Sequence, residues 1–160
     1  MNLNIPYMET DNKLLNDAYR IAAGDIVGNI VYYQNGLLTE EKPCMIAGLD
    51  YNTPWTRDTA INIWNALSIL SPEVSKNTLL AVLEEEEGNI YIGGQYWDSI
   101  IWMIGAREYC RFHKDDNFYR LAFEAGRNSV HRLEEDEFDE EDGLFRGPAV
   151  YGDGIAAYPD

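Results

Sequence analysis

The sequence predicts an all-α fold built from helical hairpins. Apolar residues recur at helical spacing along most of the 160 residues, and the competing strand pattern is confined to the short run 89–92, which could pair locally. The connections between the helical segments alternate between tight turns and long loops, which is typical of antiparallel helix pairs. Hydrophobic residues make up 46% of the chain, enough for one domain with its own core.

Start and stop signals define several of the expected helices. Asn35-Gly36 ends the first helix with a left-handed cap, and the polar stretch 113–115 is a tight turn before the last one. Ser71-Pro72-Glu73 starts the third, with an N-cap serine, a proline at the first helical position and an acid in the first turn. The helices are expected at residues 11–35, 57–70, 72–86, 96–112 and 117–133.

Three connections are long, at residues 36–56, 87–95 and 135–152. If the helices alternate up and down, these loops share one end of the domain, and each leads into the N-terminus of the next helix. Functional residues concentrate on loops held by a rigid scaffold. The three loop-to-helix junctions are therefore the expected place for a site, within a single domain of residues 1–160.

The chain is strongly acidic. Twelve basic residues against twenty-eight acidic ones give a formal net charge of −16, which argues against nucleic acid and against anionic membrane surfaces as partners. Much of the excess lies in the runs Glu84–Glu87 and Glu134–Asp142, and such runs are usually solvated faces or loops. The second run does not fit the EF-hand calcium pattern, because Phe138 stands where an acid is needed.

Cysteine and histidine are too sparse to form a site. Cys44 and Cys110 make neither a disulfide framework nor a zinc site, and His113 and His131 are expected at the surface or at helix ends. No metal and no cofactor is expected. The chain shows no signal peptide and no membrane-spanning run, so a cytoplasmic location is expected.

The three junctions span residues 51–60, 93–99 and 143–154, and each carries a carboxylate at or near a helix start together with an aromatic ring. One interpretation is structural: Asp58 and Asp98 are helix N-caps, each contributing ~1 kcal/mol, and the rings fill the core. The other interpretation is a sugar site, because carboxylates accept two sugar hydroxyls and aromatic faces pack against sugar C–H groups.

The junctions resemble the motifs of one enzyme superfamily. Residues 55–58, Trp-Thr-Arg-Asp, look like the Trp-Pro-Arg-Asp segment of glucoamylases, and residues 96–99 resemble the Tyr-Trp-Asp-Ser signature of trehalases. Residues 143–153 resemble the glycine-rich segment that ends in the general-acid aspartate of trehalases and of glycoside hydrolase family 63 glucosidases. All are six-hairpin glycosidases, so the resemblance implies that the hairpins form part of an (α/α)6 toroid.

The resemblance also implies residue roles. Asp153 matches the catalytic general acid, although Gly152 and Gly154 replace the aromatic and basic neighbours that trehalases have, which argues against trehalose as the substrate. No general base is found in the chain. The substrate-binding residues implied by the motifs are Trp55, Arg57, Asp58, Gln95, Trp97 and Asp98.

The expected function is that of a glycoside hydrolase that inverts the anomeric centre and cleaves α-glucosidic bonds in oligosaccharides. Because six hairpins close such a barrel, the chain is expected to be the N-terminal part of the catalytic domain. Self-association or a complementary chain would then cover apolar residues such as Ile100, Ile101 and Met103. Arg146 is expected to face solvent or the acidic run, away from Asp153. Two alternatives stay open: a non-catalytic carbohydrate-binding remnant, and a helical interaction module.

Overall fold

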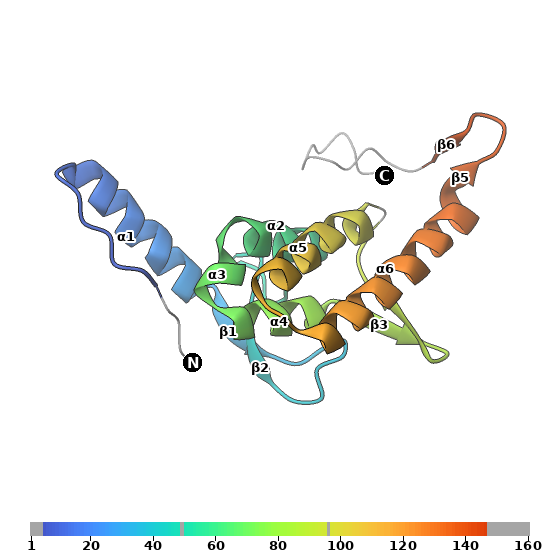
Figure 1. The fold of residues 1–160 in the computed structure, drawn as a ribbon, viewed down its shortest axis with the longest axis horizontal. Coiled ribbons are helices and arrows are strands. Elements are labelled where there is room, and N and C mark those ends of the chain that lie inside the picture. Colours follow the sequence, from blue (N-terminus) through green and yellow to red (C-terminus); the bar gives the residue numbers. More distant parts are fainter. Residues whose placement is uncertain (1–4, 49, 96, 147–160) are drawn as a thin grey trace.

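A computed structural model describes residues 5–48, 50–95 and 97–146 and shows a mixed fold (Figure 1). Of the residues that the structure describes, 56% are helical and 14% lie in strands, so the all-α prediction is wrong. In the described ranges the strands form three two-stranded antiparallel sheets. The elements are α1 (Lys13–Gly28), β1 (Ile30–Tyr33), β2 (Lys42–Met45), α2 (Thr56–Asn62), the π-helical turn η1 (Ile63–Leu67), α3 (Ser68–Leu70), α4 (Pro72–Ala81), β3 (Leu83–Glu86), β4 (Asn89–Ile92), α5 (Asp98–Phe112), α6 (Asp116–Glu137), β5 (Phe138–Asp139) and β6 (Leu144–Phe145).

The first helix is shorter than expected, because its predicted C-terminal part is a strand. The run Ile30–Tyr33 consists of β-branched and aromatic residues, which favour strands, and it pairs with Lys42–Met45. This second strand packs against α4, where the amide of Met45 donates a hydrogen bond of 3.0 Å to the hydroxyl of Thr78. Tertiary pairing therefore overrides the helical spacing that the apolar residues suggest.

The third predicted helix also ends early, and residues 83–86 form β3. The turn to β4 contains Glu87 at φ 51° and Gly88 at φ 80°, and two successive positive φ angles are typical of a type I′ hairpin. Leu83 is fully buried opposite Ile92, which anchors the hairpin to the core. Residues 89–92 thus pair locally, as the sequence allowed. Their partner strand, residues 83–86, was predicted as the end of a helix.

The remaining helices lie close to their expected positions. Residues 56–70 are helical throughout, with one π-helical turn, and the hydroxyl of Ser71 accepts a hydrogen bond from the amide of Val74 as the N-cap of α4. Asp115 caps α6, and its hydrogen bond from Lys76 at 2.6 Å is the main cause of the lowered pKa of its carboxyl. α6 continues to residue 137, so the first part of the second acidic run is helical.

The core lies between α2, α4 and α5 and the β3–β4 hairpin, with α6 along one side (Figure 1). α1 has no buried residue and projects from this body, and the β5–β6 hairpin projects on α6 at the opposite side. The exposed apolar side chains of α2, η1 and α5 include Ile61, Trp64, Ile100 and Ile104. The predicted self-association remains a prediction. The buried core consists of Met45, Ile63, Leu67, Val74, Leu79, Val82, Leu83, Ile92, Trp102, Ala106, Tyr109, Phe118 and Ala125.

Substitution by alanine is expected to change the free energy of unfolding in opposite directions at two helical glycines, Gly105 and Gly24, because their surroundings differ. A Cβ on Gly105 would lie 2.7 Å from the Cα of Ala60, so Gly105→Ala forces α5 away from α2 and is expected to cost about 1–3 kcal/mol. Gly24 in α1 has open space around it, so Gly24→Ala should add about 0.5–1 kcal/mol through helix propensity. Urea unfolding followed by circular dichroism measures both, and equal effects would contradict the close packing of α2 on α5.

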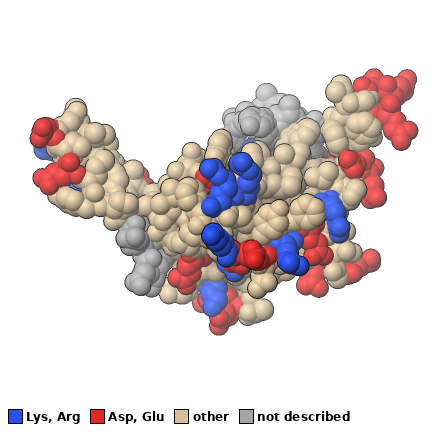
Figure 2. All heavy atoms as spheres, in the orientation of Figure 1, with Lys and Arg blue, Asp and Glu red and all other residues tan. Residues whose placement is uncertain are grey.

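The acidic and sulfur-containing residues behave largely as solvated or structural groups. Figure 2 shows acidic side chains gathered on the projecting tip that carries the β5–β6 hairpin. Arg146 pairs there with Asp139, as expected for a side chain that faces the acidic run. Both cysteines are free thiols, and burial raises the pKa of Cys44 to about 12.

Candidate functional site

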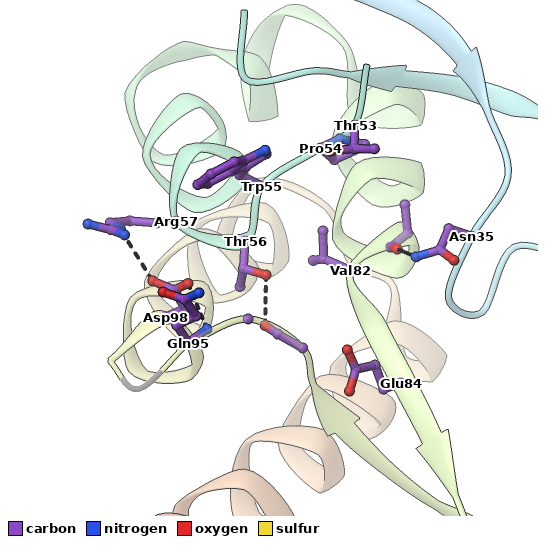
Figure 3. Close-up of a pocket in the computed structure, with 13 residues that line it drawn as sticks. Asn35, Thr53, Pro54, Trp55, Thr56, Arg57, Val82, Glu84, Gln95 and Asp98 are labelled. Atoms are coloured by element: carbon purple, nitrogen blue, oxygen red, sulfur yellow. Dashed lines mark hydrogen bonds and ion pairs between the residues drawn. The ribbon is translucent and has the colours of Figure 1, made fainter. Parts of the chain in front are cut away.

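The N-termini of α2 and α5 lie side by side and bring the first two junctions together (Figure 3). The Nε of Arg57 lies 3.2 Å from the Oδ1 of Asp98, and both side chains are largely buried, with 14% and 13% exposed. The hydroxyl of Thr56, the first residue of α2, donates a hydrogen bond of 2.7 Å to the carbonyl of Gly93. The site therefore rests on contacts between segments about forty residues apart, as the hydrogen bond from residue 57 to residue 98 shows.

The loop before α5 is shaped around the carboxylate of Asp98. Its Oδ2 accepts a hydrogen bond of 2.9 Å from the amide of Gln95, while its Oδ1 faces Arg57. Gly94 has φ 117°, and a Cβ there would lie 2.9 Å from Asp98 Oδ2 and from Thr56 Oγ1. A glycine is thus needed at position 94 for both the backbone angle and the space.

These contacts line a pocket of about 300 Å³. Trp55 borders it and is 45% exposed, and its ring contacts that of Tyr51 edge-on at 5.2 Å between centroids. The pocket combines charged groups with the apolar side chains of Pro54 and Val82. Its lining residues are Asn35, Thr53, Pro54, Trp55, Thr56, Arg57, Ala81, Val82, Glu84, Gly93, Gly94, Gln95 and Asp98.

Four of the predicted substrate-binding residues line this pocket: Trp55, Arg57, Gln95 and Asp98. Asp58 lies in the first turn of α2, where its charge interacts favourably with the helix dipole, and it is not among the lining residues. Trp97 instead contacts the ring of Phe145 in β6, at 6.2 Å between centroids. Asp153, the predicted general acid, lies outside the described residues.

Asp58 and Asp98 do not occupy the N-cap positions that the structural interpretation gave them. The N-cap residues of α2 and α5 are Trp55 and Trp97, neither of which makes a side-chain capping bond. Asp98 is the first residue of α5, and its carboxylate reaches back to the preceding loop and across to Arg57. It therefore joins the two junctions, which a simple cap does not require.

Sequence reasoning missed Glu84, which lines the pocket from β3. Its Oε1 lies 2.5 Å from the position that a Cβ on Gly93 would take, so the carboxylate lies close to this backbone. The acidic run 84–87 was interpreted as a solvated face or loop at the end of a helix, whereas a strand turns alternate residues to opposite sides. Recognition of the Glu87-Gly88 hairpin turn would have paired Glu84 with Tyr91 and placed it near Gly93.

The pocket offers hydrogen-bond donors and acceptors but no arrangement for a metal ion. Asp98 and Arg57 form a charge-assisted pair, and a carboxylate acceptor beside a guanidinium donor suits a ligand with several hydroxyls. In the part of the chain that the structure describes, no group of three or more His, Cys, Asp or Glu side chains is placed to hold a metal. Nor does any described helix have the length and apolarity needed to cross a bilayer.

Comparison with known protein families, curated proteins and solved structures finds no match to this chain.

Proposed function

We propose that the pocket binds one pyranose unit of an oligosaccharide, and that the protein is a glycoside hydrolase acting on α-glucosidic bonds. The observation that carries the proposal is the Arg57–Asp98 pair beside the half-exposed ring of Trp55 in a pocket of about 300 Å³. This volume lies at the lower end of the range for small-molecule sites, which suits a single sugar ring.

The chemistry of the lining supports a polyhydroxylated ligand. A carboxylate accepts two hydroxyl hydrogen bonds, and the bond from Arg57 and the amide of Gln95 hold the Asp98 carboxylate in one orientation. The indole of Trp55 adds a flat apolar face with a polar edge, to which the C–H side of a sugar ring can pack. Binding and orientation of the sugar are the roles we assign to these three residues.

Hydrolysis is proposed on the resemblance of the three junctions to those of glucoamylases and trehalases. In this mechanism an acid protonates the departing glycosidic oxygen while a base activates water on the opposite face, with the two carboxyls ~6.5–9.5 Å apart. We assign the acid to Asp153 by its place in the third motif. Arg57 and Asp98 would hold the sugar ring between the two groups.

Calorimetric titration of methyl α-D-glucopyranoside tests the binding step. Trp55→Ala removes the proposed stacking face and is expected to weaken the affinity by roughly tenfold, which corresponds to the ~1–1.5 kcal/mol of one aromatic contact. Trp64→Ala is the matched control, because Trp64 is similarly exposed but does not line the pocket. Equal affinities of both variants and the wild type would reject Trp55 as a sugar contact.

Release of glucose from maltooligosaccharides tests the second step separately. For a complete catalytic domain, which supplies the general base that this chain lacks, the proposal predicts glucose release and a loss of orders of magnitude in Asp153→Asn, because the amide cannot donate the proton. Sugar binding without hydrolysis would identify the protein as a carbohydrate-binding protein instead.

A further inference from the structure

Glu84 is a second acidic side chain in the pocket, at the end away from Arg57 and Asp98. Figure 3 shows Asp98 beside Arg57 and Gln95, and Glu84 apart from them on β3. Within the described residues the carboxylate of Glu84 forms no hydrogen bond or ion pair. Arg132 lies over the ring of Tyr91, the residue paired with Glu84 across the hairpin, but its guanidinium pairs with Glu86 at 2.6 Å.

The charges of the lining residues leave the pocket negative. Arg57 contributes one positive charge, and Glu84 and Asp98 contribute one negative charge each, so the formal sum is −1. Since Arg57 and Asp98 pair with each other, the uncompensated charge belongs to Glu84. The net charge of −16 for the whole chain adds a negative field around the pocket.

From this geometry we propose that Glu84 contacts the bound sugar and determines its charge class: the pocket accepts neutral and amino sugars and rejects sugars that carry a carboxylate. A hydroxyl or an ammonium group can donate to the Glu84 carboxylate, whereas an acidic group there would be repelled and left without a donor. The inference rests on the proposed sugar binding and adds the substrate class and a residue that selects it.

Three matched probes test the charge preference: methyl α-D-glucopyranoside, its 2-amino-2-deoxy analogue and the corresponding methyl glucuronoside. The variant Glu84→Gln keeps the shape of the side chain and removes its charge. The control is Glu85→Gln, since Glu85 is the next residue of β3, points to the opposite side of the strand and does not line the pocket. Both variants change the net charge by the same amount, from −16 to −15.

Wild type and Glu85→Gln are expected to bind the neutral and amino sugars and to discriminate against the glucuronoside. Glu84→Gln should reduce this discrimination by roughly three- to tenfold, as expected for one partly screened charge. Added salt should reduce the discrimination in the wild type as well. Glu84→Asp retains the charge and should keep part of the preference.

The outcomes separate this inference from the proposed function. If no probe binds the folded wild-type protein, the proposed sugar binding is wrong, and this inference is wrong with it. If the sugars bind but Glu84→Gln discriminates as Glu85→Gln does, the pocket still binds sugar and the role of Glu84 is refuted.

Discussion

Trp102→Ala is expected to lower the free energy of unfolding by about 3–5 kcal/mol. The indole of Trp102 is fully buried in α5, its ring packs near Phe118 at 6.5 Å between centroids, and its N–H donates to the carbonyl of Leu79. The substitution therefore leaves a cavity between α4, α5 and α6 and removes a buried hydrogen bond. Because domains of this size are stabilised by about 5–15 kcal/mol, the variant should be close to unfolding at 37 °C.

Urea unfolding followed by far-ultraviolet circular dichroism measures this loss without relying on tryptophan fluorescence. Trp64→Ala is the matched control, because the same atoms are removed from a side chain that is 54% exposed. The control should change the stability by about 1 kcal/mol or less. A similar loss in both variants would mean that Trp102 is not the centre of the core.

Asp98→Asn is expected to weaken the binding of methyl α-D-glucopyranoside by about ten- to a hundredfold, since a hydrogen bond to a charged group contributes roughly 1.5–3 kcal/mol. The substitution keeps the shape of the side chain but removes the charge that pairs with Arg57, at 3.2 Å from its Nε. Arg57 is then held less firmly, so the sugar loses both an acceptor and an oriented donor.

Asp116→Asn is a suitable control for Asp98→Asn. Asp116 is the first residue of α6, as Asp98 is the first residue of α5, so both substitutions remove an acid from a helix N-terminus. Asp116 is exposed and does not line the pocket. Titration calorimetry of the two variants should show weak binding for Asp98→Asn alone, and weak binding for both would assign the effect to general loss of charge.

One local start signal predicted its helix correctly, whereas the stop signal at Asn35-Gly36 did not, because α1 already ends at Gly28. Ser71-Pro72 starts α4 as expected, because an N-cap and a proline act within a few residues of the helix start. Two strands, β1 and β3, were predicted as helix, and each is a strand because it pairs with another segment. Ile30–Tyr33 follows helical spacing and is a strand because Lys42–Met45 pairs with it. Glu84 to Glu86 were predicted as helix because the turn at Glu87-Gly88 was not recognised.

The residues of the candidate site that lie in sequence motifs were predicted, and those placed by strand pairing were not. The motif residues Arg57 and Asp98 were expected to converge because loop-to-helix junctions of parallel helices share one end, and they are in contact. The position of Trp97 was not foreseeable, since it depends on where β6 places Phe145. Glu84 carries no motif, and its place in the pocket follows from the register of β3 with β4.

Nuclear magnetic resonance titration of the ¹⁵N-labelled protein with methyl α-D-glucopyranoside tests the central claim most directly. Sugar binding in the pocket predicts saturable shifts of the indole N–H of Trp55 and of the amides of Gly93, Gly94 and Gln95, which line it. The indole signals of Trp64, exposed on η1, and of the buried Trp102 should stay unchanged. Absence of saturable shifts in the folded protein, or shifts confined to residues away from the pocket, would contradict the claim that this pocket binds sugar.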